Sequence, residues 1–299
     1  MNESSINLTG TTDDVARRFL FEQADIRGET VHVHRVLEDI LANHQYAPGV
    51  CVLLGEFIAA SVLLSSTLKF EGKLILQVRS EGQIPLLMVE CNNHFEVRAI
   101  ARGAQEATAT EFEHLLTDGQ LAITIDPDKG QRYQGIVPLV ENSLARSLDA
   151  YFEHSEQLHT QFWLASDGSY AAGMLLQQLP SQVVTDPQQR QEQWQHVCSL
   201  AGTLTDRELL DLIAQEILLR LFHEDPVRLF DPRGVTFHCT CSRERTFGAL
   251  ASLAPGEIRE LVEEIGHIAM DCEFCNQQYL FTGDDLKVLI EGEDPQTLH

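Results

Sequence analysis

Four cysteines in the last quarter of the chain form two short pairs, CTC at residues 239–241 and CEFC at residues 272–275. Zinc prefers a tetrahedral shell of four soft ligands, and two close pairs brought together by a folded excursion supply such a shell. A run of 30 residues separates the two pairs, which is long enough for a small folded excursion. The spacing therefore predicts one zinc ion per chain, held by four side chains: Cys239, Cys241, Cys272 and Cys275.

Neighbouring residues could complete or tune this site. Arg243 and Arg245 follow the first pair, where they could offset the negative charge of four thiolates, or they could be exposed helix residues without that role. His238 and His267 are alternative ligands, although four cysteines already complete the shell. Asn276 follows the second pair, and asparagine tolerates the left-handed backbone that a tight metal-binding turn needs.

A four-cysteine site can be a static structural centre or a redox switch. Each short pair brings two sulfurs close enough to form a local disulfide once the metal is lost. Zinc keeps the thiolates deprotonated and therefore oxidisable, whereas a disulfide is a poor ligand. Because metal binding supplies folding energy to a small unit, losing the metal should unfold that unit. The residue pattern alone leaves both interpretations open.

The charge of the chain limits its partners. Lysine and arginine number 21 against 45 aspartates and glutamates, which gives a net charge of −24 and a sequence pI of about 4.7. Nucleic acid and anionic membrane surfaces are therefore unexpected partners, because both attract clustered cations. Residues 1–14 are polar and acidic and lack a secretory pattern, so a cytoplasmic location is expected. Residues 50–68 are apolar but contain Glu56 and several serines, which favours a buried helix over a membrane span.

The total of seven cysteines fits a reducing compartment better than a disulfide framework. Three cysteines lie outside the two pairs. Free cysteine is in general among the most buried residue types. We therefore expect Cys51, Cys91 and Cys198 to be small buried side chains.

The elements that position the site fall into three parts. Residues 1–180 mix helical and strand patterns without βαβ alternation, which predicts a large α+β domain. Residues 181–230, here called the connector, are rich in glutamine at their start and predict a helical linker. Residues 231–299 contain too little apolar material to be stable alone, so a metal ion is expected to organise them into a small zinc-binding domain.

Periodicity places elements within these parts. A helical face is expected to begin at Val15, and a second helix is expected over residues 35–44. Strands are expected at residues 30–33, 73–78, 86–90, 121–125 and 135–137. After the first cysteine pair, the pattern predicts a helix over 246–253, a break at residues 255–256, a second helix to 264 and a short strand into Cys272.

Two connector helices have clear start signals. Asp186 is a good N-cap with Pro187 at the first helical position, and the apolar side chains of this helix are few. Thr205 and Glu208 form a capping-box pattern, which predicts one strongly apolar helix reaching Leu221. We infer that the connector folds by docking on a neighbouring element and is the part of the chain that unfolds most easily.

The segment FHCTCSRER at residues 237–245, together with CEFC at 272–275, resembles the redox-regulated 33-kDa heat-shock chaperones, a family of zinc-containing bacterial holdases. Seven further segments resemble that family in the expected order: RGE at 27–29, LLGE at 53–56, LKF at 68–70, YQG at 133–135, SEQ at 155–157, GMLLQ at 173–177 and RLFHE at 220–224. Asn276 and Ala172 stand where the family often has glycine, and neither position is a ligand.

The resemblance implies an ATP-independent holdase and not an enzyme, consistent with the lack of a phosphate-binding loop motif. In such a protein the reduced, zinc-bound form would be inactive. Peroxide or hypochlorous acid, with mild heat, would join Cys239 to Cys241 and Cys272 to Cys275 and release zinc. The connector would then unfold. Client proteins that are themselves unfolding would bind to this form, and the oxidised chain would form a homodimer.

Two other functions compete with this one. An enzyme with a purely structural zinc site would need a catalytic motif elsewhere, and the sequence has no nucleophile elbow, no HExxH motif and no dinucleotide fingerprint. A zinc-ribbon module for nucleic acid is opposed by the acidic charge.

Overall fold

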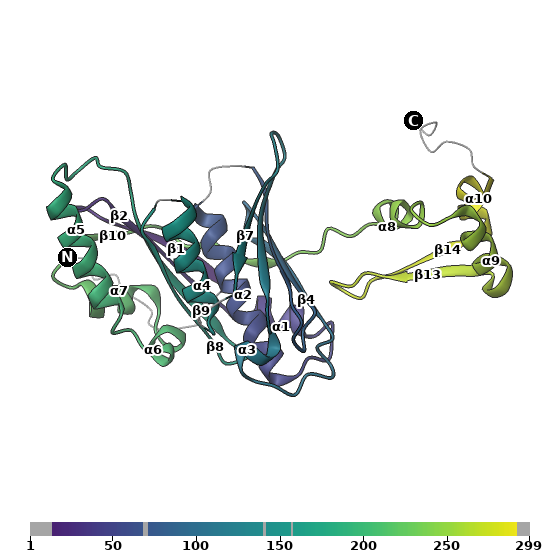
Figure 1. The fold of residues 1–299 in the computed structure, drawn as a ribbon, viewed down its shortest axis with the longest axis horizontal. Coiled ribbons are helices and arrows are strands. Elements are labelled where there is room, and N and C mark those ends of the chain that lie inside the picture. Colours follow the sequence, from purple (N-terminus) through teal and green to yellow (C-terminus); the bar gives the residue numbers. More distant parts are fainter. Residues whose placement is uncertain (1–13, 68–70, 140–141, 157, 292–299) are drawn as a thin grey trace, which may run out of the picture. The chain divides into compact units, whose positions relative to one another are not determined.

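A computed structural model describes residues 14–67, 71–139, 142–156 and 158–291 (Figure 1). The chain divides into two compact units, Met1–His238 and Cys239–His299, and each is described by itself. The polar N-terminal residues 1–13, the family-like segment 68–70 and Gln157 lie outside the described residues.

The first unit contains a six-stranded sheet in the order β10-β1-β2-β9-β8, with β11 paired to β1. Its pairings are all antiparallel, and its strands are β1 (Val15–Phe21), β2 (Ile26–Val33), β8 (Thr160–Ser166), β9 (Ala171–Gln178), β10 (Val227–Leu229) and β11 (Arg233–Gly234). Successive residues of β9 enter two different hydrophobic cores, with Leu175 in one and Met174 and Leu176 in the other. Both faces of this sheet are therefore covered.

The helix expected to begin at Val15 is wrong, because this segment is strand β1. The buried residues are Ala16, Phe19 and Phe21. Residues 15–20 pair with β2 on one side, and on the other side residues 19–21 pair with β10. Since β10 lies about two hundred residues further along the chain, local periodicity could not reveal this partner.

A second six-stranded sheet has the order β12-β5-β4-β3-β6-β7 and is antiparallel except between β12 and β5. Its strands are β3 (Gly72–Arg79), β4 (Leu86–Asn92), β5 (Glu96–Arg102), β6 (Gln120–Pro127), β7 (Tyr133–Pro138) and β12 (Thr236–Phe237). The strands expected at 73–78, 86–90, 121–125 and 135–137 are confirmed, as is the strand at 30–33 within β2. The predicted α+β fold class is confirmed as well.

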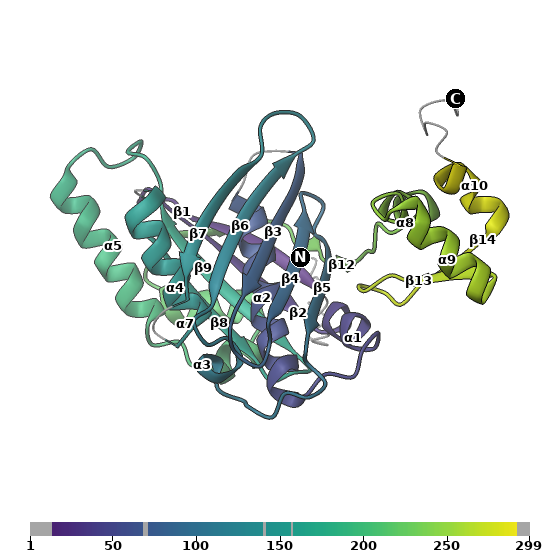
Figure 2. The ribbon, with the colours of Figure 1, turned by 45° about the vertical axis from the view of Figure 1, so that its right-hand side comes forward.

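Helix α2 (Pro48–Thr67) lies between the two sheets (Figures 1 and 2). With a mean hydropathy of 1.9 over 18 residues, this helix is long and apolar enough to cross a membrane. However, 83% of that 18-residue stretch is buried inside the protein. The expected buried helix is confirmed. The remaining helices of this part are α1 (Arg35–Leu41), α3 (Phe112–Leu115), α4 (Leu144–Tyr151) and the π-helical turn η1 (Phe152–Glu156).

The connector helices cover the face of the first sheet that points away from α2. They are α5 (Pro187–Ala201), α6 (Asp206–Asp211) and α7 (Ala214–Phe222), and their apolar side chains share a core with β1, β2 and β9. The side chain of Asp186 accepts a hydrogen bond from the Gln188 amide, and the capping box of Thr205 and Glu208 is present. Both predicted helix starts are confirmed.

The single helix expected from Thr205 to Leu221 is wrong, because the helix is interrupted between the end of α6 and the start of α7. The buried His32 of β2 donates through Nε2 to the Leu209 carbonyl at 2.8 Å. In a continuous helix that carbonyl would accept the amide of Ile213 instead. A tertiary hydrogen bond thus ends α6 where the local sequence favours continuing.

The second unit consists of α8 (Arg243–Leu250), α9 (Pro255–Ile265), the hairpin β13 (His267–Asp271) and β14 (Gln278–Thr282), and α10 (Gly283–Glu291). The two expected helices and the strand into Cys272 are confirmed. Helix α8 begins earlier than expected, because the Ser242 hydroxyl accepts the Arg245 amide as an N-cap. Among the described residues, the core of this unit has five buried apolar side chains: Leu250, Ile258, Ile268, Phe281 and Leu286.

Candidate metal centre

The four cysteines come from two backbone segments of the second unit. Cys239 and Cys241 lie in the extended segment before α8, and Cys272 and Cys275 lie in the turn between β13 and β14. In this turn the Cys272 carbonyl accepts the amides of Cys275 at 3.3 Å and Asn276 at 2.8 Å. Asn276 has a φ of 54°, so the expected left-handed conformation is confirmed.

The sulfur atoms converge. All four Sγ atoms lie within 4.8 Å of one another, with 3.6 Å between Cys239 and Cys272 and 3.4 Å between Cys241 and Cys275. A zinc ion with Zn–S bonds of about 2.3 Å requires sulfurs about 3.8 Å apart in a regular tetrahedron. The four sulfurs therefore have the spacing of a ligand shell. No histidine belongs to this group within the part of the chain that the structure describes, so His238 and His267 do not join it.

Each of these two separations connects one cysteine of the first pair with one of the second. Both exceed an S–S bond of about 2.05 Å by far, so they describe neighbouring thiols in a reduced protein. They do not select a disulfide pairing, and the expected pairing within each pair remains a prediction.

Electrostatics favour a cation at the centre of the four sulfurs. Burial opposes charge on Cys241, but hydrogen bonds from Tyr279 and Cys275 outweigh it, so the pKa of Cys241 is lowered. Burial and then the neighbouring sulfurs raise the pKa of Cys272 and of Cys275. One thiolate thus disfavours the others, because like charges at this distance repel. A divalent cation reverses the balance by stabilising all four thiolates, and the donor set fits such an ion.

The two arginines hold different parts of the unit. Arg245 donates through Nη1 to the carbonyl of Thr240 at 2.7 Å, the residue between the first two cysteines. Arg243 donates to the Leu280 carbonyl at 2.6 Å, pairs with Asp285 at 2.9 Å and lies over the Phe281 ring. Arg245 therefore supports the backbone of a ligand pair, while Arg243 ties α8 to β14 and α10. Their role in offsetting thiolate charge stays a prediction.

Tyr279 is a site residue that the sequence did not predict. Its hydroxyl donates to Cys241 Sγ at 3.2 Å, and it comes from β14, four residues after Cys275. An aromatic residue in a strand is usually interpreted as part of the hydrophobic core. Its residue type and position in the sequence do not indicate a sulfur partner. The only available signal was its closeness in sequence to the second cysteine pair.

Replacing Tyr279 with phenylalanine is expected to lower zinc affinity by about 10-fold, because residues that hydrogen-bond a metal ligand typically contribute 10- to 100-fold. Competition with a chromogenic zinc chelator measures this affinity. The matched control is Tyr133→Phe on β7, whose side chain is exposed and remote in sequence from the cysteines. Equal zinc affinity of the Tyr279→Phe variant and the wild type would contradict a role for this hydroxyl.

The other three cysteines lie in the first unit. Cys91 is fully buried, as expected, whereas Cys51 and Cys198 are half-buried. Burial raises the pKa of Cys91 and of Cys198 to about 12 and also raises that of Cys51. These groups are therefore protonated thiols near neutral pH and poor nucleophiles.

Comparison with known proteins places this arrangement in a family. Residues 14–282 match the family model described as Hsp33 protein. The chain belongs to the Hsp33 family. Two curated relatives named 33 kDa chaperonin, from Pseudomonas syringae pv. syringae and Pseudomonas aeruginosa strain LESB58, are 53% and 49% identical to this Hsp33 chain. The alignments cover 93% and 95% of the chain and 94% and 96% of those relatives.

A solved structure agrees with the Hsp33 fold. The crystal structure of a 33 kDa chaperonin, an HSP33 homolog from Thermotoga maritima, superposes with a TM-score of 0.78 at 22% identity, covering 94% of this chain and 99% of that one. At this identity the likeness shows the fold alone. Membership in the Hsp33 family confirms the resemblance found in the sequence and supports a chaperone function.

Proposed function

We propose that this Hsp33-family chain is a redox-controlled, ATP-independent holdase that is inactive when reduced and zinc-bound. The observation that carries the proposal is the convergence, within 4.8 Å, of the Sγ atoms of four half-buried cysteines in a unit whose described core has five buried apolar side chains. A core of that size is too small to hold a domain on its own, so the folding of this unit depends on what the sulfurs bind.

Cys239, Cys241, Cys272 and Cys275 would hold one zinc ion per chain. When bound, a structural zinc ion supplies about 10–16 kcal/mol of folding free energy. Tyr279 and Arg245 would position two parts of this shell through the bonds described above. The four-cysteine donor set is the one that zinc prefers in structural sites.

Oxidation would remove the ligands in pairs. Cys239 and Cys241 would form one S–S bond and Cys272 and Cys275 another, and each pair of zinc-bound thiolates would give up two electrons. For each disulfide, one hydrogen peroxide molecule accepts these two electrons and two protons from the solvent and yields two water molecules. Since each disulfide sulfur has lost its thiolate charge, the metal would leave and the second unit would unfold.

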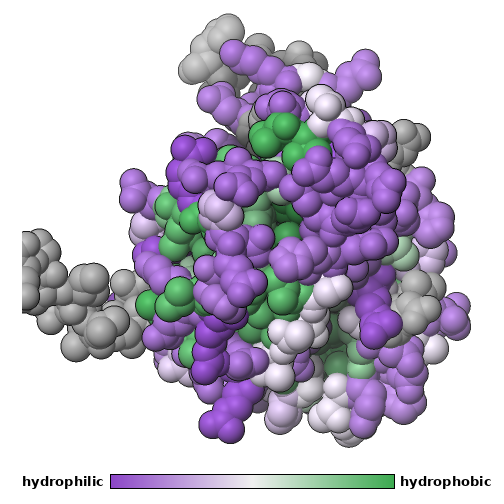
Figure 3. All heavy atoms as spheres, turned by 90° about the vertical axis from the view of Figure 1, so that its left-hand side faces the viewer, coloured by the Kyte–Doolittle hydropathy of each residue, from purple (hydrophilic) through white to green (hydrophobic). Residues whose placement is uncertain are grey.

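The consequence for the first unit would be undocking of the connector. Its helices cover an apolar face of the first sheet that includes Phe19, Phe21, Met174 and Leu176. In the docked state, the side of the molecule in Figure 3 is mostly hydrophilic, with apolar patches between. Undocking would expose both the sheet face and the helix faces, which gives unfolding clients an apolar surface to bind.

The proposal assigns three functional parts: residues 1–180 to client handling and dimerisation, 181–230 to the metastable connector and 231–299 to the redox switch. The compact units divide the chain between His238 and Cys239, so β11 and β12 pack with the first unit. The partners would be unfolded client proteins and, after oxidation, a second copy of the chain. The protein would act in the cytoplasm without nucleotide, nucleic acid or membrane, and it would catalyse no reaction.

The test of the function is light scattering from a chemically unfolded client protein that is diluted into buffer with this protein. The reduced, zinc-loaded form is expected to leave aggregation unchanged, and the peroxide-treated form is expected to suppress it. Peptide mapping of the treated form is expected to find disulfides within each pair. Equal suppression by both forms, which a purely structural zinc site would give, contradicts the switch.

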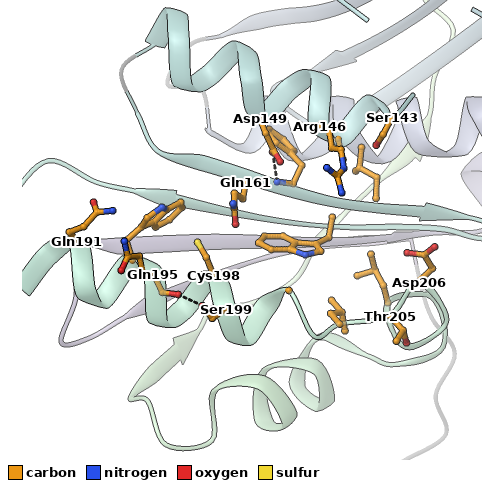
Figure 4. A pocket seen from close by; sticks show the side chains of 18 residues that line it. Ser143, Arg146, Asp149, Gln161, Gln191, Gln195, Cys198, Ser199, Thr205 and Asp206 are labelled. Carbon is orange, nitrogen blue, oxygen red and sulfur yellow. Dashed lines mark hydrogen bonds between the residues drawn. The ribbon is translucent and has the colours of Figure 1, made fainter. Parts of the chain in front are cut away.

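A cavity of about 790 Å³ lies between α4 and β8 on one side and α5 and α6 on the other. Figure 4 shows Asp149 and Arg146 on the α4 side of this cavity and Cys198 and Ser199 on α5. The connector therefore does not fill the space above β8 completely. Because this pocket opens to solvent, the connector side chains that line it bury less apolar surface on docking than they would against a filled interface.

Asp149 makes the stability of the first unit pH-dependent. Burial raises its pKa to about 7, although its Oδ1 accepts the Phe162 amide at 2.8 Å. The folded-state pKa of Asp149 lies above its unfolded value, so the folded protein favours the protonated carboxyl. The contribution of this group to the free energy of unfolding is therefore fully present below about pH 4 and is lost as the pH rises to about 7. The free energy of unfolding of the first unit is expected to fall by about 2 kcal/mol between pH 5 and 8 on account of this group.

Urea unfolding of wild type and Asp149→Asn at pH 5 and pH 8 checks this. Asparagine keeps an acceptor for the Phe162 amide but cannot ionise, so the variant is expected to lose that 2 kcal/mol dependence. The exposed Asp211→Asn serves as the matched control and is expected to behave as wild type. Identical pH dependence in wild type and Asp149→Asn would refute the assignment.

A further inference from the structure

The turn that joins β1 to β2, residues 22–25, contacts both ends of the connector. Near the start of the connector, Leu179 donates its amide to the carbonyl of Asp25 at 2.7 Å. At the far end, the amide of Glu22 donates to the carbonyl of Pro226 at 2.8 Å. One short turn thus holds the places where the connector leaves the sheet and returns to it.

The side chain of Asp25 is the centre of the first contact. Its Oδ1 accepts the amides of Gln182 at 3.1 Å and Val183 at 2.8 Å. Its Oδ2 accepts the amide of Val184 at 3.1 Å and Nη1 of Arg190 at 2.6 Å. This carboxylate is only 4% exposed, so four donors from the connector replace nearly all of its water. Burial opposes its charge, and the donors outweigh burial, so the pKa of Asp25 is lowered.

Arg190 extends the contact into the first turn of α5. Besides Asp25, its guanidinium donates through Nη2 to the Leu179 carbonyl at 2.7 Å, and its own carbonyl accepts Nε2 of Gln178 at 3.2 Å. The side chain is 16% exposed. Because the planar guanidinium donates to two acceptors at once, it fixes the direction in which α5 starts.

The segment bound by Asp25 has little else to hold it. Of residues 181–186, only Val184 is buried, and Val183 is 59% exposed. The segment contains no helix or strand, so its backbone has no ladder of its own. Polar contacts to one carboxylate therefore take the place that apolar packing has in the helices that follow.

We propose that Asp25 and Arg190 form a latch that keeps the connector docked in the reduced protein, independently of the metal centre. The docked connector in turn keeps the protein inactive as a chaperone. That inactivity rests on the proposed function, whereas the docking does not. Removing one partner of a buried, hydrogen-bonded charge pair leaves the other uncompensated, which is strongly destabilising. The connector should then open in a chain whose four cysteines are untouched.

The experiment uses full-length, reduced, zinc-loaded protein and two variants, Asp25→Asn and Arg190→Gln. Asp25→Asn keeps the size of the side chain but turns one acceptor into a donor facing the Val184 amide and Arg190. Arg190→Gln tests the same contact from the connector side should the first variant fail to fold. The matched controls are Asp211→Asn and Arg207→Gln, an exposed pair within the connector.

Hydrogen exchange is expected to be about 100-fold faster than in wild type at the amides of residues 182–184 and in α5 of both latch variants. Zinc content and exchange in β13 and β14 are expected to be unchanged. The reduced latch variants are also expected to suppress client aggregation without oxidant, while both controls behave as wild type.

Wild-type exchange rates at residues 182–184 and in α5 of the latch variants would overturn the latch. Faster exchange without client protection would also overturn it, provided that oxidised wild type protects the client in the same assay. If oxidised wild type gives no protection, the proposed function fails, and the exchange rates alone then decide whether Asp25 and Arg190 hold the connector.

Discussion

Replacing Cys272 with serine is expected to lower zinc affinity by about 100- to 1,000-fold and to unfold the second unit at limiting zinc. This magnitude is one ligand's share of the 10–16 kcal/mol that a structural zinc site provides, converted at 1.4 kcal/mol per tenfold change. A serine hydroxyl stays protonated near neutral pH and is a poor zinc ligand. Because the unit has so small a core, its β13–β14 hairpin should lose amide protection together with the metal.

Zinc content after dialysis and hydrogen exchange across residues 267–282 measure this effect. The matched control is Cys51→Ser, which changes a half-buried cysteine of the first unit and should leave both quantities as in wild type. Stoichiometric zinc at wild-type affinity in the Cys272→Ser variant would refute the ligand assignment. Loss of zinc with full protection of the hairpin would instead refute the dependence of folding on the metal.

Replacing Trp194 with alanine is expected to make the reduced, zinc-bound protein an active holdase. Trp194 on α5 is 7% exposed and is part of the core between the connector and the first sheet. Truncating a buried tryptophan to alanine typically costs about 3–5 kcal/mol. Since total stabilities are only about 5–15 kcal/mol, such a loss in one docked segment should favour its opening before the rest of the unit unfolds.

Client aggregation and near-ultraviolet circular dichroism of the reduced variant measure this outcome. Leu219→Ala is the matched control, because Leu219 is an apolar connector residue on α7 that is 68% exposed. The control should remain inactive until it is oxidised. A Trp194→Ala variant that retains zinc, suppresses no aggregation while reduced and unfolds as wild type would show that connector docking does not limit activity.

Local signals in the sequence were sufficient where the chemistry is local. Zinc-ligand spacing identified four sulfurs that the structure brings within 4.8 Å, and the caps at Asp186 and Thr205 set helix starts correctly. Asn276 was expected in a left-handed conformation and has one. In each case the deciding interaction joins residues a few positions apart, so the pattern contains the information.

The wrong element at Val15, the wrong length of the helix from Thr205 and the two missed polar contacts share one physical cause, a distant partner. Strand β1 is a strand because β2 and β10 pair with it, and α6 ends at residue 211 because His32 bonds to Leu209. The Tyr279 hydroxyl on Cys241 and the donors on Asp25 likewise join residues 38 and at least 157 positions apart. Periodicity and propensity do not report such pairs, and only the folded chain brings them together.

The most direct test of the account is a peroxide titration of the reduced, zinc-loaded protein in which zinc release and client protection are measured on the same samples. A metal-sensitive dye reports the zinc, and light scattering reports the protection. We expect one zinc ion per chain to be released and protection to rise in proportion to it. Full protection while the ion is still bound, or complete release without any protection, would contradict a chaperone controlled by its metal centre.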